Sequence, residues 1–342
     1  MKILIRGANW IGDAVMTIPA IKQIRCLYPD AHIALLTRPW AEGIFQDADL
    51  VDEIMAVEDR GAGLKEVIRQ AAEIRRRRFD LGIIFPNSYR SAAQLKLGRV
   101  KRTFGYSAQG RRFLLTDPVG VPEWKNERHE VHYYLRLVET VETRLLGTDF
   151  VKDREPDISI SVTEGRVEEA RFMIKAAGGR NSGRIVALGP GSANSRAKRW
   201  APARYAELAK KIRSAAEVDI LLLGSKEDSE IASVINGLCG GTLLDLTGKT
   251  GLGQAAGLLA AADVFVSNDM GLAHLAAAVG TPAVVIFGPT NHVTTRPYSE
   301  IAEVIREPVE CSPCMLRDCP IDHRCMERIS ADRVFGTVRK FL

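Results

Sequence analysis

Residues 2–13, KILIRGANWIGD, carry the pattern that decides the fold. Residues 2–7 form a short apolar run that ends in glycine, which predicts a buried strand. Residues 12–27 follow with branched apolar side chains at helical spacing, namely Val15, Ile18, Ile21 and Ile24. A buried strand that leads directly into an amphipathic helix is the repeating unit of parallel α/β sheets. The opening of the chain therefore predicts an α/β fold.

The same unit recurs along the chain. In the first half we expect a helix at 64–77 and further strands at 32–37, 53–57 and 81–85. In the second half, apolar strands are predicted at 184–189, 219–224, 263–267 and 283–288. Helices are predicted between and after them, at 202–215, 227–236, 253–261 and 271–279. No short fixed repeat is visible, so a solenoid is excluded.

We therefore predict two Rossmann-like parallel-sheet domains, one at 1–165 and one at 166–327. The polar stretch 149–183, with a helix at 162–177, contains the expected hinge. A C-terminal helix at about 328–342 is expected to pack back on the first domain. Because open α/β sheets bind ligands beyond the carboxyl ends of their strands, facing domains would enclose one central cleft.

The composition excludes several classes of protein. The chain has 342 residues, 46% of them hydrophobic, and a formal net charge of +5. It is neither disordered nor a small disulfide scaffold. No apolar run reaches the roughly 20 residues of a spanning helix, and the N-terminus lacks the features of a signal peptide, so a cytoplasmic protein is expected. A charge this mild does not indicate a nucleic-acid partner.

The loop at 7–13 ends in a carboxylate. Its spacing imitates a phosphate-binding GxxxxGK[ST] loop, but Asp13 replaces the lysine and Ala14 the hydroxyl residue. A carboxylate there would repel phosphate, which excludes an ATPase loop. Two interpretations of Asp13 remain open, a helix N-cap or a general base that faces the cleft.

Two loops of the second half predict an anion site. Residues 189–200 place small residues first, including Ser192, and cations later, including Lys198. Such a loop suits a diphosphate, because its amides approach the anion and its cations neutralise it. Residues 267–274 open a helix whose first amides favour negative charge, and His274 lies one turn in. Asp228 or Glu227, after the strand at 219–224, is either a ribose ligand or a helix cap.

Four of the six cysteines fall within fifteen positions, at Cys311, Cys314, Cys319 and Cys325. Their spacing is irregular for a zinc finger, although four thiolates are enough to close a tetrahedral site. A structural zinc site, reduced packing cysteines and partial disulfides all remain open.

Several motifs together resemble the bacterial lipopolysaccharide heptosyltransferases, glycosyltransferases of family 9. They are GANWIGDAVM at 7–16, FPNSYRSA at 85–92, KRWAPARYAELA at 198–209, LTGKTGL at 246–252 and SNDMGLAHLAAAVGTPAVVIFGPT at 267–290. The resemblance covers nearly the whole chain. It implies the GT-B fold and an inverting transferase that uses ADP-heptose as the donor and requires no cofactor.

The resemblance implies a role for each matching residue. Asp13 would be the catalytic base and Lys198 would bind the diphosphate. The other donor-binding residues would be Ser192, Asp228, Thr247, Asp269, Met270, Gly271, Leu272 and His274. The acceptor-binding residues would be Asn9, Arg60, Asn87, Ser88 and Arg90.

The implied acceptor is the anionic Kdo2-lipid A inner core, and the motifs at 7–16 and 85–92 favour the member that elongates its first heptose. A set of basic residues in the first domain fits such an acceptor: Arg60, Lys65, Arg90, Lys96, Arg99, Lys101, Arg102, Arg111 and Arg112. The protein would then work peripherally at the cytoplasmic face of the inner membrane. A related transferase with another acceptor or donor, and a non-catalytic nucleotide-sugar-binding protein, are the alternatives.

Overall fold

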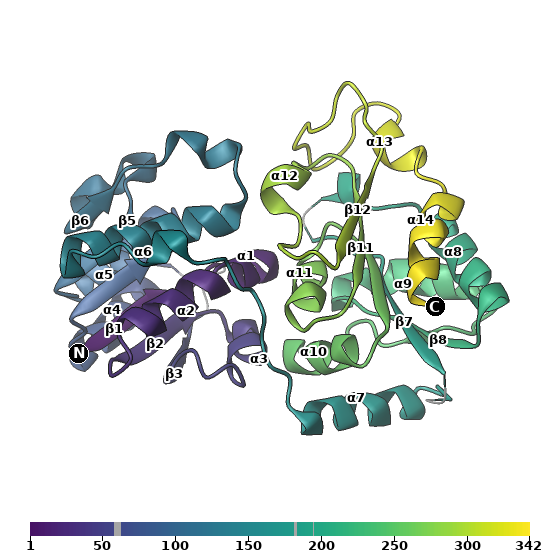
Figure 1. Ribbon diagram of the computed structural model, residues 1–342, viewed down its shortest axis with the longest axis horizontal. Coiled ribbons are helices and arrows are strands. Elements are labelled where there is room, and N and C mark those ends of the chain that lie inside the picture. The colour runs from purple at the N-terminus through teal and green to yellow at the C-terminus, as the bar shows by residue number, and fades with distance from the viewer. Residues whose placement is uncertain (58–62, 181–182, 194) are drawn as a thin grey trace. The chain divides into compact units, whose positions relative to one another are not determined.

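The computed structural model describes all residues except 58–62, 181–182 and 194. The chain forms two compact units, Met1–Ile158 and Ser159–Leu342 (Figure 1). The boundary lies before the expected position at 165, because helix α7 (Glu164–Ala176) packs against α10 (Leu252–Ala260) of the second unit. Among the described residues, no helix combines the length and apolar composition that crossing a membrane requires.

The first unit contains a six-stranded parallel sheet in the order β3-β2-β1-β4-β5-β6. Its strands are β1 (Lys2–Arg6), β2 (His32–Thr37), β3 (Glu53–Ala56), β4 (Leu81–Ile84), β5 (Arg102–Tyr106) and β6 (Asp117–Val119). Strand β1 is central, with Ile3 opposite both Ile33 and Leu81. Four of its five residues are buried, as expected for a strand covered on both faces.

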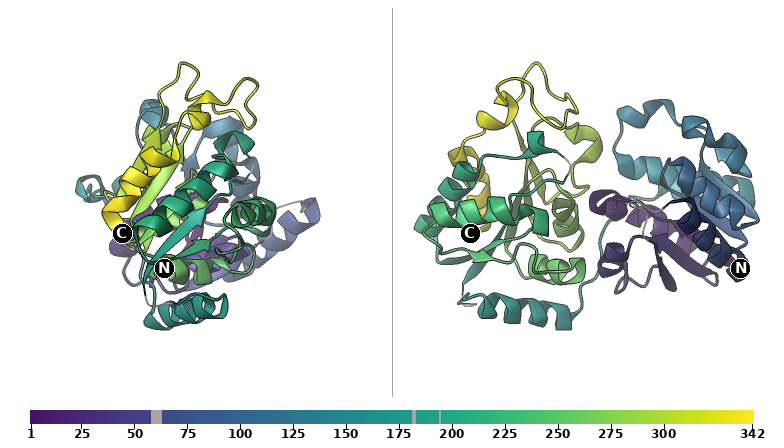
Figure 2. Two further views of the ribbon diagram at one scale, coloured as in Figure 1. Left: turned by 90° about the vertical axis from the view of Figure 1, so that its right-hand side faces the viewer. Right: turned by 180° about the vertical axis from the view of Figure 1, so that it is seen from behind.

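Helices cover both faces of this sheet (Figures 1 and 2). The helices are α1 (Ile11–Met16), α2 (Ile18–Leu27), α3 (Glu42–Phe45), α4 (Leu64–Arg77), α5 (Tyr89–Leu97) and α6 (Glu130–Leu146). Helices α4 and α5 pack together, and Ile74 and Leu95 join Leu4 of β1 in one hydrophobic core. Helices α2 and α6 pack against each other on the other face.

The helix expected at 12–27 is two helices, α1 and α2, with Thr17 between them. Pro19 explains the break, because its nitrogen has no hydrogen to donate and its ring would clash with the carbonyl one turn earlier. Helix α1 therefore has only six residues, and Asp13 lies in its first turn.

The second unit repeats the topology, with a parallel sheet in the order β12-β11-β10-β7-β8-β9. Its strands are β7 (Arg184–Gly189), β8 (Val218–Leu222), β9 (Leu244–Asp245), β10 (Val264–Asn268), β11 (Ala283–Phe287) and β12 (Ala302–Arg306). Its remaining helices are α8 (Pro202–Ala215), α9 (Ser229–Leu238), α11 (Gly271–Ala278), α12 (His292–Thr295), α13 (Arg324–Glu327) and α14 (Ala331–Val338). Two short 3-10 helices, η5 (Arg196–Lys198) and η6 (Lys226–Asp228), follow β7 and β8.

The C-terminal helix α14 packs on α8 and β11 of this second unit. Val334 and Val338, four residues apart on one helix face, are fully buried in the same core as Leu208 of α8. The expectation that this helix packs back on the first unit is therefore wrong. Its apolar stripe is already covered within the second unit.

Each sheet reverses its strand order once, between β1 and β4 in the first unit and between β7 and β10 in the second. In open parallel sheets, ligands bind at this switch point, outside the carboxyl ends of the two strands. The chain directly after β1 and β4 contains Asp13, in the first turn of α1, and Asn87 and Ser88; the chain after β7 and β10 contains Lys198 and Asp269. Both sets of predicted site residues therefore lie where this topology places ligands.

Candidate active site

The loop after β7, residues 189–200, is held by Asn268, the last residue of β10 and fully buried. We call it the β7 loop; its residue 194 lies outside the described residues. The Asn268 side-chain nitrogen donates to the carbonyls of Pro190 (2.7 Å) and Gly191 (3.1 Å). Its oxygen accepts from the Trp200 amide (2.9 Å) and the Tyr205 hydroxyl (3.1 Å). One side chain therefore fixes both ends of the β7 loop.

Lys198 and Asp269 are brought together in the second unit. The Lys198 Nζ lies 2.7 Å from Asp269 Oδ2, and the Thr290 hydroxyl donates to the same oxygen at 2.7 Å. Asp269 is almost fully buried, whereas the Lys198 side chain keeps a quarter of its surface exposed. An ammonium has three N–H donors, so the contact with Asp269 leaves donors for an anion. Three strand ends, those of β7, β10 and β11, therefore meet at one charged group.

Two hydroxyls of the second unit are buried and have no hydrogen-bond partner among the described residues, Ser192 Oγ and Thr247 Oγ1. Buried polar groups are nearly always paired, so each marks a place for a ligand atom or a water. Gly248 follows in a left-handed conformation (φ +71°), and a Cβ there would lie 2.9 Å from Lys226 Cα. The turn at Thr247 therefore requires glycine and lies directly against η6.

Asp228 forms the end of a capping box in η6. Its Oδ2 accepts from the amide and the hydroxyl of Ser225, at 3.0 and 2.8 Å. Its Oδ1 lies 4.0 Å from the Arg199 guanidinium. A Cβ on Gly191 would approach the Asp228 carboxyl group to 2.2–2.4 Å, so only glycine fits beside it. The helix-cap interpretation of Asp228 is thus confirmed, and its contact with ribose stays a prediction.

Helix α11 begins directly beside the β7 loop. Its N-cap, Met270, is extended, and no side chain among the described residues caps its first turn. The Met270 sulfur would lie 2.8 Å from a Cβ on Gly189. Gly271 opens the helix, and Leu272 and His274 are buried within it. The uncapped first-turn amides carry the partial positive charge that favours an anion.

In the first unit, Asp13 is the third residue of α1, and the N-cap is Trp10. The N-cap interpretation of Asp13 is therefore wrong. Its side chain is only partly buried. Burial raises the pKa of Tyr134 well above its usual value, and the Asp13 charge adds to the shift, so the carboxylate lies within electrostatic range of that ring. A partly exposed carboxylate at a sheet switch point is chemically suited to accept a proton.

The loop that carries Asn9 is held by Arg6, the buried last residue of β1. The Arg6 guanidinium donates to the carbonyls of Gly7 (2.7 Å) and Leu36 (3.3 Å), and to Asn9 Oδ1 (3.1 Å). It also donates to Gln94 Oε1 of α5 at 3.3 Å. Arg6 therefore holds the loop after β1 by hydrogen bonds, as Asn268 holds the β7 loop.

Asn87 and Ser88 lie after β4 and are held by a second buried arginine, Arg111. The Arg111 guanidinium donates to the Ser88 carbonyl (3.0 Å), to Asn87 Oδ1 (3.3 Å) and to the Tyr106 carbonyl (2.8 Å). Burial lowers the pKa of Arg111 to about 10. Asn87 also donates to the Tyr133 hydroxyl at 2.9 Å, and Ser88 caps α5. Both predicted acceptor ligands thus have structural partners as well.

The remaining basic residues that were expected to contact the acceptor lie in different parts of the first unit. Arg90 lies in the first turn of α5, partly buried, and its charge helps to lower the pKa of Glu66. Arg60 lies outside the described residues. Lys101 and Arg102 pair with Asp80 (2.6 Å) and Asp117 (2.5 Å). Lys101 directly precedes β5 and Arg102 begins it, at the amino-end edge of the sheet. Their predicted place on an acceptor face is therefore wrong. The same prediction is wrong for Arg111, which is buried.

The cysteines are all free thiols. Within the described part of the chain, no group of three or more His, Cys, Asp or Glu side chains is arranged to hold a metal ion. The zinc interpretation of Cys311, Cys314, Cys319 and Cys325 is therefore not supported by the structure.

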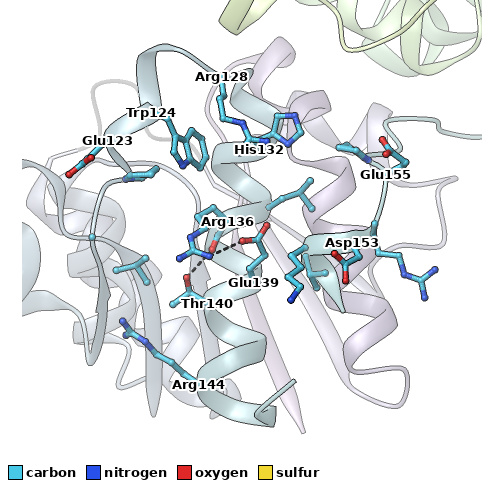
Figure 3. A pocket seen from close by; sticks show the side chains of 18 residues that line it. Glu123, Trp124, Arg128, His132, Arg136, Glu139, Thr140, Arg144, Asp153 and Glu155 are labelled. Atoms are coloured by element: carbon cyan, nitrogen blue, oxygen red, sulfur yellow. Dashed lines mark hydrogen bonds and ion pairs between the residues drawn. The ribbon is translucent and has the colours of Figure 1, made fainter. Parts of the chain in front are cut away.

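A pocket of about 910 Å³ lies on the outer face of α6, between the loop after β6 and residues 151–156 (Figure 3). His132, Arg136, Thr140 and Arg144 line it from α6, and Arg136 pairs with Glu139 at 3.0 Å. None of the predicted site residues lines this pocket. The spacing of four between these side chains along α6 is a sequence signal for the pocket, whereas the motifs at strand ends do not point to it. Nor do those motifs indicate that Asn268 and Arg6 hold the loops.

Comparison with known proteins places this geometry in context. The family model described as glycosyltransferase family 9 (heptosyltransferase) matches residues 67–324. Lipooligosaccharide heptosyltransferase 2 of Haemophilus ducreyi is 30% identical, over 90% of this chain and 88% of that protein. Lipopolysaccharide heptosyltransferase 2 of Escherichia coli is 29% identical over the same shares. The structure of E. coli ADP-heptose LPS heptosyltransferase II superposes with a TM-score of 0.83 at 26% identity, covering 100% of this chain and 98% of that one.

Proposed function

Because the chain belongs to glycosyltransferase family 9, the heptosyltransferases, we propose that it transfers heptose from ADP-L-glycero-D-manno-heptose to the first heptose of the Kdo2-lipid A inner core. The relatives that share about 30% identity over most of both chains are named heptosyltransferase 2, whereas heptosyltransferase 3 of E. coli is 24% identical. That difference favours the inner-core acceptor that already carries one heptose.

The observation that carries the proposal is the charged group at the β7/β10 switch point. Lys198 is held by Asp269 there, next to the uncapped start of α11. The negative charge of an ADP diphosphate beside these groups would be stabilised by the Lys198 ammonium and by the helix amides. The buried hydroxyls of Ser192 and Thr247 supply two further hydrogen-bonding partners for the nucleotide sugar.

The proposed reaction inverts the configuration at the anomeric carbon of the heptose. The acceptor hydroxyl attacks that carbon while its bond to the diphosphate oxygen breaks, and the electron pair leaves with ADP. The hydroxyl proton passes to the Asp13 carboxylate, which acts as general base. Negative charge grows on the leaving diphosphate, where Lys198 and the α11 amides stabilise it.

The proposed acceptor side is the switch point of the first unit. Asn9, Asn87, Ser88 and Arg90 would contact the sugar and its anionic groups there, together with Arg60. The acceptor is a membrane lipid, so we propose that the protein works peripherally at the cytoplasmic face of the inner membrane. Its partners would be ADP-heptose, the anionic Kdo-lipid A core and that membrane surface.

The proposal is tested by offering purified protein ADP-heptose with two acceptors, Kdo2-lipid A with one heptose and the same lipid without heptose. Transfer to the one-heptose acceptor is expected. Transfer only to the heptose-free acceptor would assign the protein to the preceding step of the same pathway. Binding of ADP in preference to UDP and GDP, measured by calorimetry, is the matching donor test.

A further inference from the structure

The proposed reaction uses none of the cysteines, yet two of them belong to the segment that packs against Gly288, directly after β11. Glu310 and Arg324 form an ion pair at 3.5 Å, and each directly precedes a cysteine, Cys311 and Cys325. The neighbouring Ser312 hydroxyl donates to the Gly288 carbonyl at 2.6 Å. The Cys325 sulfur lies 3.2 Å from the position of a Cβ on the same glycine. Cys325 and the residue that follows Cys311 therefore both contact Gly288, from opposite ends of one segment.

The two thiols differ in accessibility. Cys311 is exposed, whereas Cys325 is buried. Burial raises the pKa of Cys325 to about 11, and the nearby Cys311, Cys314 and Cys319 add to the shift. Because Cys311 is exposed and Cys325 is buried, Cys311 is the thiol that a soluble oxidant meets first.

The segment between them, residues 311–325, supports the β7 loop directly. The Ala197 amide donates to the Arg317 carbonyl at 2.9 Å, and the His323 ring lies 2.6 Å from the Ala197 carbonyl. Arg196 pairs with Asp318 at 2.6 Å. Ala197 immediately precedes Lys198, so this segment positions the proposed diphosphate ligand.

Residues 311–325 also contact the chain beside Thr290, the second partner of Asp269. The Met315 amide donates to the Pro289 carbonyl at 2.8 Å, and Pro289 immediately precedes Thr290. Thr290 in turn donates to Asp269. Residues 311–325 therefore contact the chain next to both groups that hold Asp269.

We propose that Cys311 and Cys325 are a modification site for peroxides, at which oxidation to a disulfide weakens binding of the donor nucleotide. Hydrogen peroxide converts the Cys311 thiol to a sulfenic acid with release of one water. The Cys325 sulfur then attacks the Cys311 sulfur, the S–O bond breaks, and a second water leaves as the disulfide forms. Two thiols lose two electrons and two protons, and one peroxide is reduced to two waters.

The direction of the effect follows from packing. A disulfide needs a sulfur–sulfur distance of about 2.05 Å, whereas both cysteines are free thiols here and Cys325 packs against Gly288. Closing the bond moves one or both ends of the segment, and Arg317 and Met315 move with them. The effect on nucleotide affinity rests on the proposed function, because it requires Lys198 to bind the diphosphate.

The test oxidises the full-length protein with one equivalent of hydrogen peroxide and compares it with the reduced protein. Peptide mapping by mass spectrometry is expected to find Cys311 joined to Cys325. Calorimetry is expected to give an ADP dissociation constant at least tenfold higher after oxidation, restored by dithiothreitol. Cys311→Ser should keep its affinity through the treatment. The control Cys26→Ser removes another exposed thiol, on α2 of the first unit, and should respond as the unaltered protein does.

A disulfide absent from the map, or present with unchanged ADP affinity, overturns the proposal. Hydrogen exchange of the Ala197 amide, measured on the same samples, is expected to speed up on oxidation whether or not ADP binds. Reduced protein that binds no ADP would contradict the proposed function instead. In that case a mapped disulfide with unchanged exchange at Ala197 would still overturn this inference.

Discussion

At the scale of single residues, two buried polar side chains hold the two loops that carry the candidate site. Arg6 ends β1 and Asn268 ends β10, and each is fully buried. Each donates hydrogen bonds to loop carbonyls, and these bonds replace those that water would otherwise make. A buried carbonyl that loses its donor keeps the full cost of desolvation. These residues therefore determine the shape of the loops.

Replacing Asn268 by alanine should destabilise the second unit by about 1–3 kcal/mol, because the carbonyls of Pro190 and Gly191 lose their donor. ADP affinity should fall in parallel, since the β7 loop loses both anchors. Urea unfolding and calorimetry measure the two effects. Asn236→Ala is the matched control, because the Asn236 side chain accepts from the Leu243 amide, outside the β7 loop. Unchanged ADP affinity in a folded Asn268→Ala protein would contradict the positioning role.

Asp13→Asn preserves the shape of the side chain and removes its basicity. Turnover should fall by about 10²–10⁴-fold, the usual contribution of a general base. ADP affinity should stay unchanged, because the proposed donor ligands belong to the other unit. Asp30→Asn, a change at an exposed aspartate beyond α2, is the control. Turnover within a few-fold of normal in Asp13→Asn would rule out its proposed role.

At the scale of elements, the β7 loop and η6 fit together only because Gly191 has no side chain. The Asp228 carboxyl group occupies the space that a Cβ would need. Asp228 is in turn committed to Ser225 through the capping box. The contact joins the loops after β7 and β8 on one side of the candidate donor site.

Gly191→Ala should therefore destabilise the second unit by about 1–3 kcal/mol, the usual cost of overpacking, and weaken ADP binding. Gly237→Ala is the control, since no described atom lies within 4 Å of its Cβ position in α9. That change should instead stabilise by about 0.5–1 kcal/mol. Adding Asp228→Ala to Gly191→Ala should relieve the overlap. Strict additivity of the two losses in urea unfolding would show that the overlap is not the cause.

At the scale of the whole molecule, the two units repeat one strand order around separate cores. All the proposed donor ligands lie in the second unit, whose sheet is complete within Ser159–Leu342. The proposed base lies in the first. The proposed roles therefore predict that transfer needs both units, whereas nucleotide binding needs only the second.

Residues 159–342 produced alone should fold cooperatively and bind ADP with an affinity within about tenfold of the full chain, a difference of about 1.4 kcal/mol. Residues 1–158 should fold but bind no ADP, and neither piece should transfer heptose. Circular dichroism and calorimetry measure folding and binding. Nucleotide binding by the first piece, or an unfolded second piece, would contradict this division of roles.

Local patterns in the sequence were sufficient for the alternation of strands and helices and for the glycine-containing loops. Periodicity and turn composition depend on neighbours within a few positions, and helix α8 was predicted at its observed bounds, residues 202–215. The strands β5, β6, β9 and β12 were not predicted, because they are short or include charged residues. The helices α3, α5, α6, α12 and α13 were not predicted either.

The sequence by itself determined the fold class, the family and the loops in which the candidate residues lie. Only the tertiary structure decided the strand order, the place of α14 and the partners that hold the site. Asn268 meets Pro190, and Arg111 meets Ser88, across long stretches of chain. Such partners are chosen because buried polar groups must be satisfied by whatever the fold brings near, and no local pattern specifies which group that is.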